Sequence, residues 1–185
     1  EIFDGVTMIP TINEGAFKLL QDLCATDGGI KDFLASRSKS KIMTILVALA
    51  NHKNTAYRAL AVQILSTPHA VYGLARRGED KSDQIMTLLE YKFTAKQTTQ
   101  ILSESGAVLG LAFHGQANRL MKLLESDIFA PQQKIRILEA ENTIYALSHS
   151  FLDQAKQVKN LMASLNMIPT HPPSSTLDVT SQALV

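Results

Sequence analysis

The chain contains little that would support metal, disulfide or nucleophile chemistry. Its 185 residues include one cysteine, Cys24, and no tryptophan. A single cysteine excludes an internal disulfide and a cysteine-based zinc cluster, and it fits a reducing, cytoplasmic compartment. The five histidines form no pair at a spacing of three or four residues, and no carboxylate pattern accompanies them. We therefore expect no metal site, no cofactor and no enzyme activity.

Neither sign of charge dominates the sequence. Lys and Arg together number 18 and Asp and Glu number 17, which gives a formal net charge of +1. A protein that binds nucleic acid chiefly through phosphates needs a broad cationic surface, so nucleic acid is not the expected partner. One local exception is the basic run with Arg37, Lys39 and Lys41. Such a run is either a solvated loop or a contact for a polyanion or an acidic peptide.

Long apolar runs are also missing. The longest, residues 42–50, is interrupted by Thr44 and is far shorter than the ~20 residues that span a bilayer. We expect no transmembrane helix and no membrane partner. No basic segment followed by an apolar one opens the chain, so no secretory signal is expected in it. Because the first residue is Glu1 and not Met, the sequence is expected to be a fragment of a longer protein.

Helical periodicity is the main feature that the sequence does contain. Apolar residues recur at spacings of three and four almost throughout, whereas alternating β-branched runs are scarce. The pattern predicts an all-α chain of about eight to ten helices. The first helix is predicted to run from a capping box at Thr11 and Glu14 to the Gly28-Gly29 pair. The others are predicted at 30–36, 39–51, 55–65, 67–77, 80–91, 94–114, 116–125, 132–150 and 152–165.

The predicted domain organisation is simple. Residues 1–10 form an N-terminal extension, residues 11–166 form the helical domain, and residues 167–185 form a tail. The tail is rich in Pro, Ser and Thr and has few apolar residues to bury, so it is expected to be flexible. Cys24 lies on the apolar stripe of the first helix and is expected to be a buried small side chain instead of a nucleophile.

A short phrase recurs along the chain. Each copy has a large residue, a small one, Leu, a small one and a variable fifth residue, and the leucines fall at 49, 74, 111 and 147, at intervals of 25, 37 and 36 residues. Intervals in the high thirties are typical of a helical solenoid, whose units bury their apolar faces by stacking. Small residues let a neighbouring helix approach closely. The copies are Val47-Ala-Leu-Ala-Asn51, Tyr72-Gly-Leu-Ala-Arg76, Leu109-Gly-Leu-Ala-Phe113 and Tyr145-Ala-Leu-Ser-His149.

These phrases resemble the third helix of an armadillo repeat, and residues 28–34 resemble the glycine turn and following helix of that repeat. The resemblance covers about residues 12–165 and implies an armadillo/HEAT-like right-handed helical solenoid. In that family the third helices line a groove that holds an extended peptide. Carried over by position, the partner-binding residues are Asn51, Tyr72, Arg76, Tyr145 and His149. Phe113 takes the equivalent place in the third copy, and we expect it in the core.

Residues 154–156, which follow the fourth copy, are similar to those of large centriolar scaffolds of the rotatin type. That resemblance implies association with the centrosome or cytoskeleton. For Tyr72 and Tyr145 two interpretations remain open, an aromatic contact in the groove or core packing with the hydroxyl at the rim.

The sequence therefore predicts a non-catalytic protein–protein interaction scaffold that binds a helix or an extended segment of a partner protein. The alternative is a helical module that binds nucleic acid or another polyanion. The residues that would serve the alternative are basic: Arg37, Lys39, Lys41, Arg76, Arg77 and Lys81.

Overall fold

The computed structural model describes residues 10–76, 78–150 and 152–167. All regular structure in these residues is helical, which confirms the all-α prediction. None of the described helices is long and apolar enough to cross a membrane. Residues 1–9, Arg77 and the tail from residue 168 onward lie outside the described part. The elements are α1 (Glu14–Leu23), α2 (Asp27–Ser36), α3 (Lys39–Asn51), α4 (Thr55–Leu65), α5 (Ala70–Ala75), α6 (Glu79–Tyr91), α7 (Ala95–Leu102), α8 (Ala107–Leu111), η1 (Ala112–Gln116), α9 (Ala117–Glu125), α10 (Pro131–Leu138), α11 (Thr143–His149) and α12 (Leu152–Ser164).

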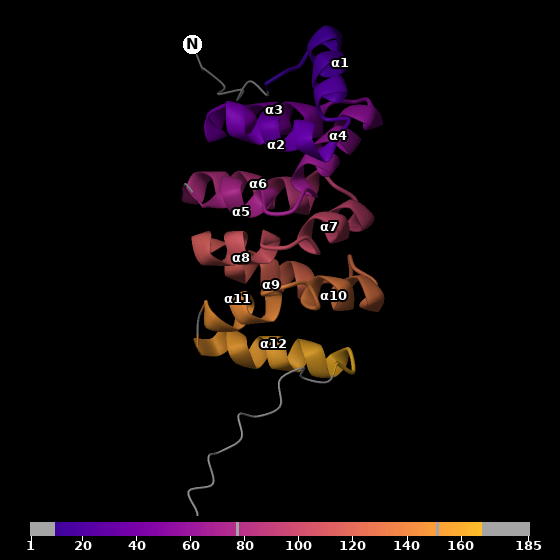
Figure 1. Cartoon of the computed structure of the whole chain (residues 1–185). Helices are drawn as coiled ribbons and strands as arrows, with labels where there is room; N and C mark the ends of the chain where they lie inside the picture. The colour runs from indigo at the N-terminus through magenta and orange to yellow at the C-terminus, as the bar shows by residue number, and fades with distance from the viewer. Residues whose placement is uncertain (1–9, 77, 151, 168–185) are drawn as a thin grey trace, which may run out of the picture.

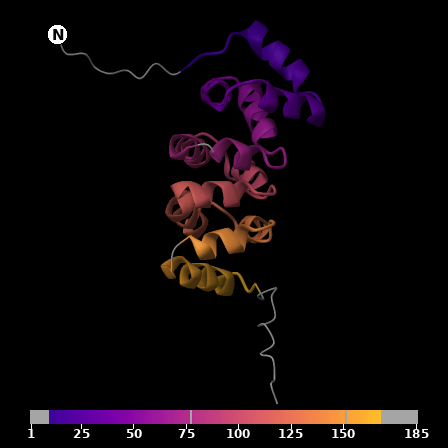
Figure 2. The same ribbon diagram turned by 60° about the vertical axis from the view of Figure 1, so that its left-hand side comes forward.

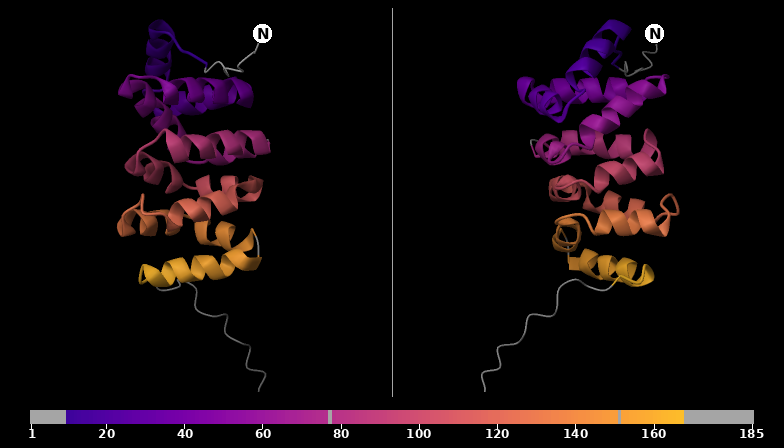
Figure 3. Two further views of the ribbon diagram at one scale, coloured as in Figure 1. Left: turned by 180° about the vertical axis from the view of Figure 1, so that it is seen from behind. Right: turned by 45° about the vertical axis from the view of Figure 1, so that its right-hand side comes forward.

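The helices form an elongated stack in which each group of three lies on the next (Figure 1). Three columns run along the stack. In the first, α4 packs against α7 and α7 against α10; in the second, α5 packs against α8 and α8 against α11. The third column contains α3, α6, α9 and α12 in that order. The same order from α1 to α12 along one axis is visible from the other sides in Figure 2 and Figure 3.

A left-handed backbone turn recurs just before each middle helix of the stack, which is α5, α8 or α11. His69, Gly106 and Asn142 each precede the middle helix of a unit, and their φ angles are 65°, 79° and 63°. They are 37 and 36 residues apart, the same intervals as the phrases. Adjacent turns are also bonded to each other, because the His69 amide donates to the Ser105 carbonyl at 3.3 Å. The Ser105 hydroxyl in turn donates to Glu141 at 3.0 Å.

These left-handed turns overturn two of the predicted helices. The single helix predicted at 94–114 is two helices, α7 and α8, separated at Gly106. The helix predicted at 132–150 is likewise α10 and α11, separated at Asn142. The apolar spacing continues across both turns, so periodicity gave no signal there. The break predicted at Gly115 is confirmed, since Gly115 has φ 91° and lies in η1, just before α9 begins.

The start of the chain also differs from the prediction. The side chain of Asn13, not Thr11, caps α1 by accepting from the Ala16 amide at 2.8 Å. Gly28 and Gly29 do not end the first helix, because α1 ends at Leu23 and both glycines lie in the first turn of α2.

One continuous core runs through the stack. It includes fully buried residues from every column, such as Leu46 on α3, Ile64 on α4, Ile85 on α6, Leu111 on α8 and Leu147 on α11. Burying a side chain of this size contributes about 1.5–3 kcal/mol. The units therefore stabilise one another, because the apolar face of each unit is buried only when the adjacent units pack against it.

Arg119 adds a polar connection between α6 and α9. Its guanidinium donates to both oxygens of Glu90, at 3.0 and 2.9 Å, and also pairs with Asp83. The hydrogen bond to Glu90 is the largest cause that raises the pKa of Arg119. A two-pronged arginine–carboxylate contact has a fixed geometry, so it sets the register of α9 on α6.

Candidate functional site

Three of the four phrases occupy equivalent places in the stack. The copies that contain Tyr72, Leu109 and Tyr145 lie on α5, α8 with η1, and α11, which form the second column. The first copy lies on α3, which belongs to the third column and packs against α4 and α6. The first interval, 25 residues, is therefore irregular because Leu49 lies on α3 whereas Leu74 lies on α5, which is in a different column. In the three later units the phrase is on the middle helix, whereas the resemblance implied the third.

The second column carries an exposed aromatic cluster formed by Phe113, Tyr145 and His149. Phe113 and Tyr145 are 50% and 54% exposed. Their ring centroids are 6.3 Å apart, and the Tyr145 ring stacks on His149 at 4.2 Å. The prediction that Phe113 lies in the core is wrong, because η1 turns its side chain to the surface. The sequence-predicted Tyr145 and His149 are in direct contact.

Tyr72 and Arg76 lie farther along the same column, on α5 and at its end. Tyr72 is half-buried, and a Cβ on Gly110 would stand 2.7 Å from the Tyr72 Cα. Arg76 is exposed. Tyr72 is in no stacked or tilted ring pair with another described residue. It is therefore set apart from the aromatic cluster and partly serves the packing of α5 on α8.

Asn51 and His149 occupy the fifth position of their phrases and make the same local hydrogen bond. The Asn51 amide donates to the Val47 carbonyl at 2.9 Å, and His149 Nδ1 lies 2.9 Å from the Tyr145 carbonyl. A carbonyl can only accept, so His149 Nδ1 carries the proton. Each side chain thus bonds back to the carbonyl four residues earlier in its own helix. His149 retains Nε2 for a partner group, whereas Asn51 lies in another column.

The basic run has structural contacts of its own. The Arg37 guanidinium lies 5.3 Å from the centroid of the buried Phe33 ring, and the Lys39 ammonium donates to the Leu34 carbonyl at 3.2 Å. Lys41 is exposed on the first turn of α3. Of the other basic residues in the alternative hypothesis, Lys81 pairs with Asp80 at 3.5 Å. Arg77 lies outside the described residues.

Metal-ligating and nucleophilic side chains were the remaining candidates for chemistry in the described residues. They contain no group of three or more His, Cys, Asp or Glu side chains placed to hold a metal ion. Cys24 is fully buried, and desolvation raises the pKa of its thiol. A thiol with a raised pKa has less of the nucleophilic thiolate at neutral pH.

Cys24 should therefore react slowly with alkylating reagents while the protein is folded. We expect iodoacetamide at pH 8 to modify it at least ~100-fold more slowly than in the urea-unfolded chain, because reaction needs an opening of the structure. Mass spectrometry of timed samples measures the rate, and equal rates in both states would contradict this assignment.

The raised pKa of the Cys24 thiol also means that, as the pH rises, the unfolded chain loses the thiol proton before the folded chain does. Stability should thus decrease as the pH rises past the ordinary thiol value of about 8.5.

Two adjoining pockets lie at the α1 end of the stack. The first lies among α1, α2 and α3, and the second lies between residues 10–11 and the end of α3. Their volumes are about 330 and 270 Å³. Among the predicted partner-binding residues, Asn51 lines the second pocket. Arg37 lines the first. The pattern of phrases gave no indication of these pockets, because they depend on the orientation of α1.

No protein-family model, curated protein or solved structure matches the chain. The described surface is therefore the basis for a functional assignment.

Proposed function

We propose that the chain is a non-catalytic protein-interaction module with an armadillo/HEAT-like solenoid architecture. It binds a helix or an extended segment of a partner protein along the second column, which is α5, α8 with η1, and α11. The recurring left-handed turns and the phrases at 36- and 37-residue intervals support the repeat architecture. A cytoplasmic location, at the centrosome or cytoskeleton, is the part of this proposal that rests on sequence resemblance and on the single cysteine.

The observation that carries the binding proposal is the exposed aromatic cluster of Phe113, Tyr145 and His149. Two large rings about half exposed beside each other leave apolar area in water that a partner would cover. Aromatic side chains are over-represented among the residues that dominate binding energy. The free Nε2 of His149 adds a polar group that fixes the register of a bound segment.

The length of the column agrees with a short bound segment. Tyr72 on α5 and Tyr145 on α11 are two helix steps apart, and packed helices are about 8–10 Å apart. An extended chain advances about 3.3 Å per residue, so five or six residues reach from one to the other. Arg76 lies exposed at the Tyr72 end and would contact an acidic group on the partner.

A matched pair of double variants tests this proposal. Phe113→Ala with Tyr145→Ala removes the cluster, whereas Tyr91→Ala with Ile128→Ala removes two side chains of similar exposure, 75% and 55%, elsewhere on the surface. We expect the first pair to reduce partner recovery in a quantitative affinity pulldown by at least ~10-fold, as for interface hot spots, and the second to leave it unchanged.

Circular dichroism and thermal unfolding establish that both double variants fold. Either an unchanged partner set for the cluster variant or an equal loss in both variants would rule out the aromatic cluster as the binding surface.

A further inference from the structure

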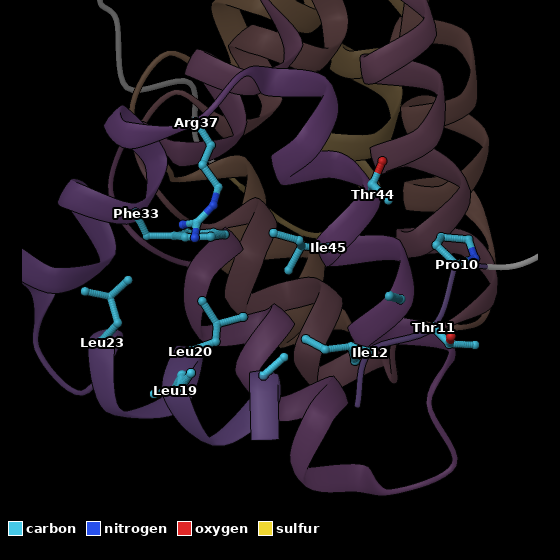
Figure 4. A pocket seen from close by; sticks show the side chains of 12 residues that line it. Pro10, Thr11, Ile12, Leu19, Leu20, Leu23, Phe33, Arg37, Thr44 and Ile45 are labelled. Atoms are coloured by element: carbon cyan, nitrogen blue, oxygen red, sulfur yellow. The ribbon is translucent and has the colours of Figure 1, made fainter. Parts of the chain in front are cut away.

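The two pockets at the α1 end form one groove. Pro10, Thr11 and Ala48 line both pockets, so the pockets adjoin each other beside α3, and we treat them as one groove. We call this feature the α1–α3 groove. In Figure 4, Arg37 and Phe33 lie at one side of the first pocket and Pro10 and Thr11 at the other. The labelled apolar side chains line the wall between them.

The groove exists because α1 projects beyond α2 and α3 at the end of the stack, upright in Figure 1, while contacts hold its inner face. Tyr57 is sandwiched between Phe17 and His52, with ring centroids 3.7 and 3.6 Å apart. Gln63 on α4 donates to the carbonyl of Cys24, at the end of α1, at 3.0 Å. These contacts fix the position of α1 without filling the space beside it. The groove is therefore preformed, which lowers the entropic cost of binding.

The wall of the groove is largely apolar, and no other described residue covers it. Leu19 on α1 is 74% exposed, an unusual value for a large apolar side chain that lines a concave surface. Leu23 beside it is also exposed, and Ile45 faces them from α3. A partner that covers these side chains gains about 25 cal/mol for each Å² of apolar area removed from water.

Positive charge lies at both ends of the groove. Arg37 lines one end, where stacking on Phe33 holds its guanidinium at the rim. Lys53 lines the other end. His52 also lines this end, and its Nδ1 accepts from the Asn54 amide at 3.0 Å. The 13 residues of α3 separate the two cations, which corresponds to about 18–20 Å at 1.5 Å per residue. Among the described residues that line either pocket, none is acidic.

We propose that the α1–α3 groove binds an acidic segment of a partner protein, extended over about six residues, with apolar side chains in the middle and carboxylates toward both ends. The apolar centre contacts Leu19, Leu23 and Ile45, while the carboxylates pair with Arg37 and Lys53. A nucleic-acid backbone fits this surface less well, because its evenly spaced phosphates would meet an apolar wall between two cations. This site is separate from the aromatic cluster and does not depend on the function proposed above.

Selection from a random peptide display library against the whole chain tests the proposal. We expect the recovered peptides to be enriched in Asp and Glu on either side of two to four apolar residues. Fluorescence polarisation of the best peptide should then show at least ~10-fold weaker binding to Arg37→Glu and to Leu19→Glu, corresponding to 1.4 kcal/mol each. Both side chains are at the surface, so these variants are expected to fold.

Two controls make the outcome specific. Lys31→Glu reverses an exposed charge on α2 that does not line either pocket, and Phe113→Ala with Tyr145→Ala removes the aromatic cluster. Both should bind the selected peptide as the unchanged chain does.

The proposal is overturned if selected peptides show no acidic and apolar enrichment, or if they bind Arg37→Glu and Leu19→Glu normally. It is also overturned if a single-stranded DNA oligonucleotide binds at this site more tightly than any selected peptide and weakens steeply with added salt.

Discussion

Replacing Gly110 by alanine is expected to lower the free energy of unfolding by ~1–3 kcal/mol, the usual cost of overpacking a tight contact. A Cβ at this position would lie 2.7 Å from the Tyr72 Cα and 3.3 Å from the Tyr72 backbone nitrogen. Both are backbone atoms, so α5 and α8 must move apart. The close approach of these middle helices, which the small residues of the phrase predict, therefore depends on Gly110.

Gly73 provides the matched control, because it occupies the same place in the preceding phrase. Nothing lies within 4 Å of a Cβ built on Gly73. Since Gly inside a helix costs about 0.5–1 kcal/mol relative to Ala, Gly73→Ala should leave stability unchanged or raise it by that amount. Urea unfolding monitored by circular dichroism gives both values. Equal effects of the two substitutions would contradict the stacking of α5 on α8.

Replacing Gly29 by alanine is the second substitution with a large expected effect. A Cβ here would lie 1.7 Å from the Leu23 carbonyl oxygen, a distance that requires the end of α1 or the start of α2 to move. We expect a loss of ~1–3 kcal/mol in the free energy of unfolding. Because Cys24 directly follows Leu23, the displacement should also expose its thiol and speed its alkylation.

The adjacent Gly28 again gives a matched control. Its Cβ would be 3.9 Å from the Thr26 hydroxyl, an ordinary contact. Gly28→Ala should therefore leave both the urea midpoint and the rate of Cys24 alkylation close to those of the unchanged chain. If Gly29→Ala behaved in the same way as Gly28→Ala, α1 and α2 would not meet as described.

Helices could be predicted from sequence where a capping residue and a change in apolar spacing coincide. The predicted range 39–51 is the observed range of α3, and the Ser38 hydroxyl caps it by accepting from the Lys41 amide at 3.3 Å. Asn54 and Thr55 are both candidate caps for the helix predicted at 55–65, and Asn54 is the one that caps α4, by accepting from the Ala56 amide at 2.9 Å. In both places a polar side chain satisfies a free amide just before an apolar run begins.

The left-handed turns could not be predicted in the same way. His69 and Asn142 adopt positive φ angles that non-glycine residues seldom take. Apolar residues keep their helical spacing on either side of Asn142, so periodicity alone joined α10 to α11. The turn becomes recognisable only when it is compared with Gly106 and His69 at the same interval.

The candidate site was predicted only in part, for a geometric reason. Matching the phrases in register brought Tyr145 and His149 together correctly, since residues four apart share a helix face. It also placed Asn51 with them, although α3 belongs to another column. The exposure of Phe113 was not predicted, because apolar spacing does not show that the helix passes into η1 at Ala112.

The central claim is that this chain acts by presenting the aromatic cluster to a partner protein. The most direct measurement places a photo-crosslinking phenylalanine analogue at position 145 and, in a second sample, at position 91, where Tyr91 is exposed on α6. We expect irradiation in cells to join a discrete partner to the chain at position 145 and not at position 91. Crosslinking of the same proteins from both positions, or from position 91 alone, would contradict the claim.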